Sequence, residues 1–167
     1  MIRSYALAAT AALVAFTGTH ALAAEALPSE THKILPAALA VEAADAAIAT
    51  CKGQGYNVSV VITDRSGTPK LLLMGDGAGN LSSTIARRKA YTAAQLRVST
   101  GDFAKRVQGG GFNPAVFDNQ LVTAQGGLPI KVGNDTIGAI GVSGAPGGDK
   151  DEACASAGLA KISDRLL

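Results

Sequence analysis

Apolar residues occur along this chain in short runs separated by turn sequences, a pattern typical of β-hairpins. A first hairpin is predicted over 58–63 and 70–74, because Asp64-Arg65-Ser66-Gly67 supplies a turn between the two runs. A second is predicted over 128–132 and 136–143, where a glycine-containing turn again separates two apolar runs. The pattern therefore predicts two antiparallel strand pairs.

Three further segments have the composition and the end signals of helices. The alanine-rich run 37–51 follows Pro36, a residue favoured at a helix start. Residues 81–98 form a second predicted helix. A third begins at Asp149, which is predicted to form a capping box with Glu152, each side chain accepting a hydrogen bond from a backbone N–H. The glycine-rich segment before the second hairpin predicts a long irregular loop of the kind that often binds ligands.

The helix over 81–98 is predicted to be amphipathic. At about 100° per residue, its buried face consists of Leu81, Ile85, Ala86, Lys89, Thr92, Ala93 and Leu96. Arg87, Arg88 and Tyr91 lie on the other side, which is expected to be a solvated surface. Lys89 has two interpretations: its ammonium group extends from the edge of the buried face into water, or it points into a pocket and neutralises a carboxylate ligand.

Glycines occur inside the last predicted strand, where they are costly. Gly138 and Gly141 fall on opposite faces of 136–143, and interior glycines mark a bulge, a close backbone approach or a ligand. The glycine-rich sequence that follows, 144–148, precedes acidic residues, which place negative charge where a phosphate would bind. We therefore expect close packing against this strand and reject a dinucleotide site.

The N-terminus has the features of a secretory signal peptide. Arg3 supplies the positive charge, Tyr5 to Phe16 an apolar core, and Ala21-Leu22-Ala23 a small-residue cleavage pattern. The predicted organisation is a signal peptide over 1–23 and a single domain over 24–167. The mature protein is expected to be periplasmic or secreted, with no integral membrane segment.

Two cysteines, Cys51 and Cys154, remain after cleavage. In an oxidising compartment a disulfide is the leading interpretation, although sequence alone cannot place the two Cα atoms within bridging range. A metal site is less favoured, because no further Cys or paired His supplies the other ligands.

The overall charge gives little support for a polyanionic partner. The 167-residue chain has a formal net charge of +2, and removal of Arg3 brings acids and bases closer to balance. Aromatic residues, at 4%, are too few to form base-stacking platforms. We expect neither nucleic acid nor an anionic membrane as a partner.

Three segments together resemble the GlcG/HbpS-like haem-binding family, which is related to the C-terminal domain of PduO-type proteins. The segments are Val58 to Asp64 with Gly67, Ala86 to Ala93 with its Lys-Ala-Tyr-Thr-Ala sequence, and Gly126-Gly127-Leu128-Pro129-Ile130 continuing through 137–144. The resemblance covers nearly the whole mature chain. It implies a small α+β fold, with an antiparallel sheet of about five strands and flanking helices, assembled into a homo-oligomer. It also implies non-covalent binding of haem or a related tetrapyrrole, with haem-degrading activity in some members.

Haem requires an apolar slot, cations near its propionates and usually a ligand to iron. The candidate haem-binding residues are His32, Met74, Lys89, Tyr91 and Thr92, with Tyr56 as a further possible ligand. His32 is the candidate metal ligand, because His20 leaves with the signal peptide. Its position before the first helix also favours a solvated imidazole, and haem held with weak or solvent ligation is the alternative.

Three functions remain open. The first is an exported haem-binding protein with a cleft bordered by the glycine-containing strand, Lys89 and the 109–114 loop. The second is an enzyme acting on haem or on a small oxygenated metabolite, with Asp64, Lys89 or Asp118 as the acid or base. The third is a non-catalytic periplasmic module that partners a sensor. No nucleophile triad is visible, so we assign no catalytic residue.

Overall fold

The computed structural model describes residues 31–166, so the predicted signal peptide and the mature residues up to 30 lie outside the described part of the chain. In chain order the elements are α1 (Ala37–Gly53), β1 (Ser59–Asp64), β2 (Pro69–Met74), α2 (Asn80–Leu96), α3 (Thr100–Gln108), β3 (Gly127–Val132), β4 (Asp135–Ser143) and α4 (Gly148–Ile162), with short 3₁₀ helices η1 (Pro114–Val116) and η2 (Ser163–Arg165). Within the described residues, no helix combines the length and the apolar composition needed to cross a membrane.

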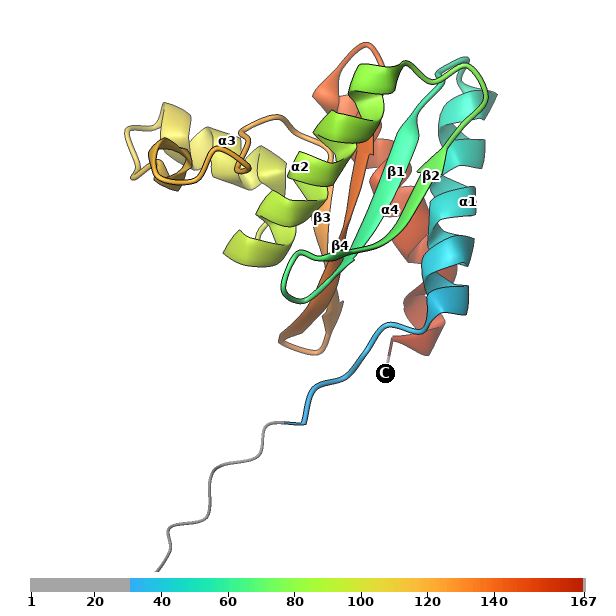
Figure 1. The fold of residues 1–167 in the computed structure, drawn as a ribbon, viewed down its shortest axis with the longest axis horizontal. Helices are drawn as coiled ribbons and strands as arrows, with labels where there is room; N and C mark the ends of the chain where they lie inside the picture. The colour runs from blue at the N-terminus through green and yellow to red at the C-terminus, as the bar shows by residue number, and fades with distance from the viewer. Residues whose placement is uncertain (1–30, 167) are drawn as a thin grey trace, which may run out of the picture. The chain divides into compact units, whose positions relative to one another are not determined.

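The strands form one antiparallel sheet in the order β2-β1-β4-β3 (Figure 1). Both predicted hairpins and the α+β class are confirmed. The expected number of about five strands is corrected to four among the described residues, since the chain between α2 and β3 forms α3, η1 and irregular turns instead of another strand.

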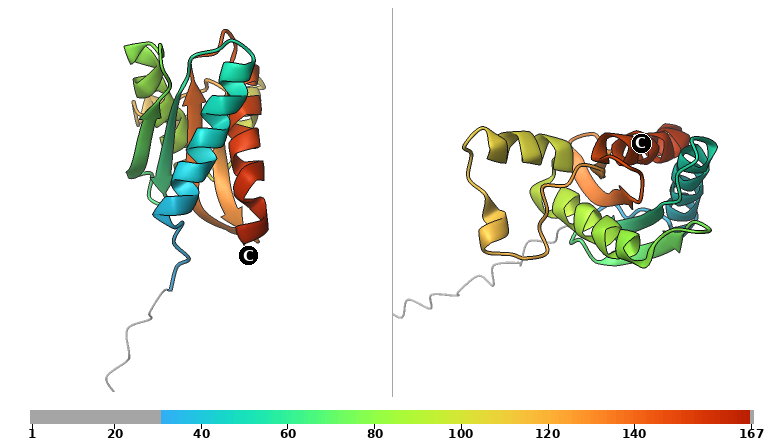
Figure 2. Two further views of the ribbon diagram at one scale, coloured as in Figure 1. Left: turned by 90° about the vertical axis from the view of Figure 1, so that its right-hand side faces the viewer. Right: turned by 90° about the horizontal axis from the view of Figure 1, so that it is seen from above.

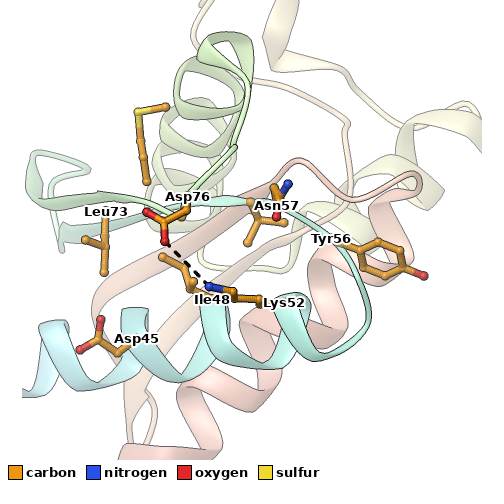
Figure 3. A pocket seen from close by; sticks show the side chains of 10 residues that line it. Asp45, Ile48, Lys52, Tyr56, Asn57, Leu73 and Asp76 are labelled. Atoms are coloured by element: carbon orange, nitrogen blue, oxygen red, sulfur yellow. Dashed lines mark ion pairs between the residues drawn. The ribbon is translucent and has the colours of Figure 1, made fainter.

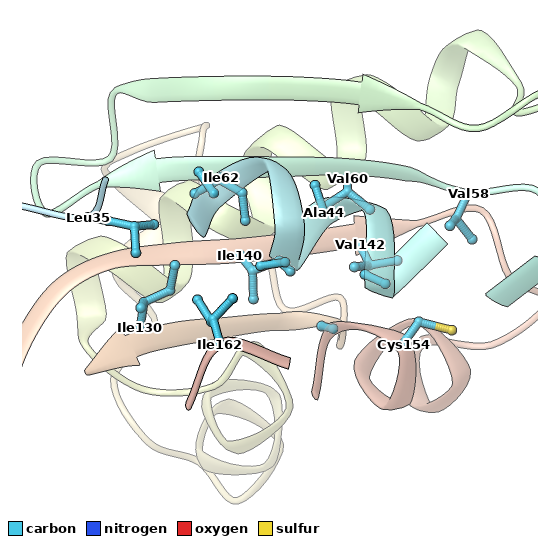
Figure 4. Packing of buried hydrophobic residues seen from close by; sticks show 14 of the residues in the cluster. Leu35, Ala44, Val58, Val60, Ile62, Ile130, Ile140, Val142, Cys154 and Ile162 are labelled. Carbon is cyan, nitrogen blue, oxygen red and sulfur yellow. The ribbon is translucent and has the colours of Figure 1, made fainter. Parts of the chain in front are cut away.

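The helices form two layers around the sheet. α1 and α4 lie together on one face and α2 lies on the other (Figure 2). The main core fills the α1/α4 side, where Val60, Ile62, Ile140 and Val142 point from the central strands β1 and β4 (Figure 4). The alternate strand positions, which include Val61, face α2. α3 and the segment after it extend beyond α2, away from the sheet.

The glycines of β4 permit close backbone approaches, as the sequence predicts. A Cβ added at Gly141 would lie 2.2 Å from the carbonyl oxygen of Ala86 in α2, and one at Gly138 would lie 2.3 Å from the carbonyl oxygen of Thr63 in β1. α2 therefore rests directly on the backbone of β4, without side chains between them.

A disulfide joins Cys51 near the end of α1 to Cys154 in α4, with a Cα–Cα distance of 5.6 Å. The predicted pairing is confirmed. Both cysteines are fully buried, and the bond spans a sequence separation of 103 residues. A cross-link over so long a segment stabilises the fold mainly by restricting the unfolded chain.

The start of α4 differs from the prediction. The helix begins at Gly148 after Gly147, and no side chain caps it, so the predicted capping box between Asp149 and Glu152 is wrong. The carboxylate of Glu152 turns toward Gly101 of α3, where one of its oxygens is buried without a hydrogen-bond partner. Tertiary contacts of the first turn have replaced the local capping pattern.

The buried face of α2 is largely as predicted. Ala86, Lys89, Thr92 and Ala93 are buried, and Ile85 and Leu96 are half-buried. The prediction that Leu81 is buried is wrong, because its side chain is 69% exposed. In this first turn Ser82 faces the sheet instead, with its hydroxyl 2.7 Å from that of Ser59.

Candidate functional site

The outer side of α2 holds the segment that follows η1. The Tyr91 hydroxyl donates a hydrogen bond to Oδ2 of Asp118 at 2.8 Å. This hydrogen bond to a carboxylate, reinforced by partial burial, raises the pKa of the Tyr91 phenol. Tyr91 therefore keeps its proton and fixes Asp118 against the helix.

Arg88 and Thr92 extend this attachment along the next residues. The Arg88 guanidinium donates to the carbonyl oxygens of three consecutive residues, Asn119, Gln120 and Leu121. The Thr92 hydroxyl accepts from the backbone N–H of Val122 at 3.0 Å and donates to its own helix at the carbonyl of Arg88. Residues 118–122 are thus held to α2 by three of its side chains.

Two adjoining hollows follow the outer side of α2, and we call them together the α2 groove. The polar hollow, of about 450 Å³, is lined by Thr84, Arg87, Arg88, Tyr91, Asn119 and Gln120. The apolar hollow, of about 220 Å³, is lined by Val61, Pro69, Leu72, Ser83, Thr84 and Arg87. Because Thr84 and Arg87 line both, an apolar surface and a cation meet at this place.

The apolar part of the α2 groove arises because α2 covers β1 and β4 and leaves the edge strand β2 partly open. Leu72 pairs with Val61 across the strands, and Met74 pairs with Ser59, so both side chains of β2 lie on the face that carries α2. Leu72 is 52% exposed and Met74 is 42% exposed. Leu72 therefore remains accessible beside Arg87, and Met74 remains accessible further along the same face of β2.

Arg87 is the uncommitted cation of the α2 groove. It is exposed and forms no hydrogen bond or ion pair with any residue between 31 and 166. Arg88, in contrast, is occupied by backbone carbonyls. Arg87 can therefore donate two parallel N–H···O hydrogen bonds to a carboxylate of a ligand.

Lys89 lies on the inner side of α2, where it is 2% exposed. Its Nζ is 2.7 Å from Oδ2 of Asp151 and 2.9 Å from the carbonyl oxygen of Val142. The other oxygen of Asp151 accepts from the N–H of Ala145 at 2.9 Å. Burial lowers the pKa of Lys89 and raises the pKa of Asp151, while the hydrogen bond between them opposes both shifts.

The backbone around Lys89 leaves no room for other side chains. A Cβ at Gly126 would lie 2.7 Å from Cβ of Asp151 and 2.9 Å from Nζ of Lys89, and Gly126 has a positive φ of 122°. A Cβ at Gly127 would lie 2.4 Å from the carbonyl oxygen of Lys89. The Gly126-Gly127 pair of the sequence is therefore required for the ion pair to form.

The predicted haem-binding residues fall into three places. Tyr91 lines the α2 groove and Met74 lies on the same face of the sheet. Lys89 and Thr92 are buried behind it, in contacts within the protein. His32 lies at the other end of the sheet, where its Nδ1 contacts the guanidinium of Arg65 in the β1–β2 turn.

Sequence reasoning missed Arg87 as a site residue, together with its neighbour Leu72. Two sequence features could have indicated these residues. The alternation of β2 places Leu72 and Met74 on one face, and α2 carries adjacent cations on its outer side.

A smaller hollow lies between α1 and β2, on the opposite face of the sheet (Figure 3). It measures about 200 Å³ and has Ile48 and Leu73 among its lining residues, with Lys52 and Asp76 paired at 3.8 Å. Its cation, Lys52, is thus paired, and Asp45 adds a further carboxylate to the lining. No group of three or more His, Cys, Asp or Glu side chains in the described part of the chain is placed to hold a metal ion.

The fold and the α2 groove define a small α+β domain with a ligand-sized surface hollow. Residues 35–160 match the family described as "Haem degrading protein HbpS-like", and the chain belongs to this family. The resemblance noted from the sequence is confirmed.

Individual relatives agree with this assignment. The crystal structure of HbpS is similar with a TM-score of 0.73 and 36% sequence identity, covering 79% of this chain and 92% of that one. The crystal structure of a PduOC:heme complex is similar with a TM-score of 0.72 and 26% identity, covering 78% of this chain and 96% of that one. A 15.0 kDa protein of Citrobacter freundii, encoded between dhaT and dhaS, is 37% identical over 101 residues, or 56% of this chain and 69% of its own length.

Proposed function

We propose that this protein is an exported haem-binding protein and that the α2 groove is where the haem lies. The observation that carries the proposal is that the exposed side chain of Leu72 and the guanidinium of Arg87, which has no ion pair within residues 31–166, line the same hollow. Membership of the HbpS-like family and similarity to a protein solved with haem support the choice of ligand. The signal-peptide pattern over 1–23 supports export.

The residues of the α2 groove fit the chemistry of haem. Pro69 and Leu72 offer an apolar surface to one face of the macrocycle, and Arg87 offers a bidentate partner to a propionate. When bound, the haem iron supplies the redox and ligand-binding chemistry. The chain itself contributes binding, orientation and partial exclusion of water.

Met74 and Tyr91 are the candidate iron ligands nearest this surface. The Met74 thioether follows Leu72 on the same face of β2, and it needs no deprotonation to act as a ligand. The Tyr91 phenol is held protonated by Asp118, which disfavours the phenolate that iron prefers. We therefore propose Met74 as the ligand in place of His32, which contacts Arg65 of the β1–β2 turn at the other end of the sheet.

Assembly into a homo-oligomer is part of the proposal. Phe112, Val116 and Phe117 are 72%, 72% and 80% exposed on the segment beyond α2, and the two phenylalanine rings stack with centroids 6.0 Å apart. Large apolar side chains gathered in this way are typical of interaction surfaces. Sedimentation velocity of the wild type and of a Phe117→Ser variant would test this, and an unchanged monomer in both would contradict it.

Titration of haem into the purified protein lacking residues 1–23 tests the function. We expect a saturable shift of the Soret band. Arg87→Ala should weaken binding about 5- to 10-fold, the scale of one charge-assisted contact. Lys131→Ala, which removes an exposed cation on β3, is the matched control and should change nothing.

Two further variants separate the outcomes of this titration. Leu72→Glu should abolish the shift, and Met74→Leu should alter the visible spectrum while preserving most of the affinity. A spectrum identical to free haem in the wild type, or equal affinity in Arg87→Ala and Lys131→Ala, would overturn the proposed site. Decay of the Soret band in haem-loaded protein given ascorbate and oxygen would reveal degradation in addition to binding.

A further inference from the structure

A separate hollow of about 410 Å³ lies on the inner side of α2, between residues 124–125 and the glycine-rich turn that leads into α4. We call it the α4 hollow. Lys89, Ser143, Gly147, Gly148 and Asp149 are among the residues that line it. Its volume falls within the range of about 300–1,000 Å³ typical of small-molecule sites.

Ser143 presents an unused hydroxyl group to the α4 hollow. Its side chain is on the face of β4 toward α2, because Val142 points to the core on the other face. The residue is only 6% exposed, and its hydroxyl makes no hydrogen bond to any residue of the described range 31–166. The hydroxyl is therefore available for a hydrogen bond to a ligand in the hollow.

The first turn of α4 contributes further donors. The carbonyl oxygen of Gly147 accepts from the N–H groups of Lys150 and Asp151, but the N–H groups of Gly148 and Asp149 have no acceptor among the residues that the structure describes. α4 is 15 residues long, so its N-terminus carries a substantial positive partial charge. The small residues of this turn leave the two N–H groups accessible.

Lys89 adds a third kind of donor. An ammonium group has three N–H bonds, and Lys89 directs two of them to Asp151 and Val142. One N–H bond is left for a ligand. Each oxygen of Asp151 accepts one hydrogen bond, from Lys89 and from the N–H of Ala145, so its charge is compensated inside the protein.

The α4 hollow therefore brings together four donors, from Ser143, Gly148, Asp149 and Lys89, that match a ligand rich in acceptors. We propose that the α4 hollow binds the carboxylate of a small organic acid, held by the Ser143 hydroxyl, the N–H groups of Gly148 and Asp149, and Lys89. Two carboxylates oppose the ligand: that of Asp149, which is exposed and lies beside Gly147, and that of Glu152, whose charge acts on Lys89. Both limit the affinity for anions. The site is independent of the α2 groove and requires no haem.

Amide NMR titrations of the haem-free protein with acetate and with pyruvate test this proposal. We expect saturable shifts centred on the amides of Ser143, Gly148 and Asp149. Ser143→Ala should weaken binding about 5- to 10-fold through the loss of one hydrogen bond. Asp149→Asn should strengthen it several-fold by removing the repulsion. Lys131→Ala is the control for non-specific attraction of anions and should leave the affinity unchanged.

Acetamide, a neutral molecule of similar shape, checks the requirement for charge and should bind more weakly than acetate. The proposal is overturned by shifts that do not saturate, by equal shifts with acetamide, or by unchanged affinity in a folded Ser143→Ala variant. Shifts confined to Arg87 and its neighbours would also overturn it, because they would place the carboxylate in the α2 groove. Since haem is absent from these experiments, their failure leaves the haem titration unaffected.

Discussion

The two sides of α2 carry cations in opposite circumstances. Lys89 on the inner side is 2% exposed and is bound to Asp151 of α4 and to the backbone of β4. Arg87, two residues earlier on the outer side, is exposed and without an ion pair in the described part of the chain. One helix thus uses one charge to hold the fold together and leaves the other available for a ligand.

This difference shows that the burial of a charged side chain and its availability to a ligand are separate properties. A buried lysine in a hollow has the features expected of a functional group, since its pKa is shifted by burial and it has a specific charged partner. Two of its three N–H bonds are nevertheless committed to the protein. For a carboxylate as large as a haem propionate, the exposed guanidinium is the better placed cation.

Replacing Lys89 should have the largest effect on stability. Lys89→Ala leaves the buried carboxylate of Asp151 without its partner, and the free energy of unfolding should fall by about 3–5 kcal/mol in urea denaturation. Arg87→Ala is the matched control and should stay within about 0.5 kcal/mol of the wild type.

A second variant keeps the test of the ion pair sharp. Lys89→Met combined with Asp151→Leu removes both charges, so it should recover much of the stability that Lys89→Ala loses. Equal losses of unfolding free energy in Lys89→Ala and Arg87→Ala would mean that the Lys89–Asp151 ion pair does not stabilise the fold. The contrast between the two sides of α2 would then be contradicted.

An intermediate effect is expected where the inner side of α2 touches the sheet. In Gly141→Ala the new methyl group would meet the carbonyl oxygen of Ala86 at 2.2 Å and the N–H nitrogen of Ala90 at 2.5 Å, so α2 must move outward. We expect a loss of about 1–3 kcal/mol in the free energy of unfolding.

Gly53→Ala is the control for the glycine substitution itself. Gly53 is the last residue of α1, and an added Cβ there meets nothing within 4 Å, so the variant should be as stable as the wild type or more stable. If both alanine variants had the same stability, the close approach of α2 to β4 would not be what requires glycine.

Local signals predicted most of the fold. The turn sequence around Gly67 and the alternation of apolar residues located the hairpins, and the glycines of β4 indicated the close approach of α2. The contacts at the site could not be predicted in this way, because they join residues far apart in the sequence. Asp151 is 62 residues from Lys89, and its local pattern favoured a capping box nearby over an ion pair.

The apolar part of the α2 groove could not be predicted for a related reason. The alternation of β2 indicates that Leu72 and Met74 share a face, but whether they are covered depends on where α2 lies across the sheet. The helix crosses near β4 and β1, because Gly141 admits it there. The exposure of Leu72 beside Arg87 is therefore a consequence of tertiary packing that neither segment encodes alone.

The smallest effect concerns the outer side of α2 and can be seen without unfolding the protein. Because Asp118 accepts a hydrogen bond from Tyr91, the phenol of Tyr91 titrates above its ordinary pKa of 10.0. Its protonated form is favoured by folding, so the contribution of this contact is present below about pH 10 and is lost as the pH rises through the raised value.

In Asp118→Asn the partner is neutral, and the pKa of Tyr91 should move back toward 10.0. Absorbance at about 295 nm, compared between this variant and the wild type, each with Tyr56→Phe to simplify the signal, measures the change. Identical titrations would show that Asp118 does not hold the outer side of α2, whereas the loss of the raised value would confirm that the α2 groove is bounded by a hydrogen-bonded segment.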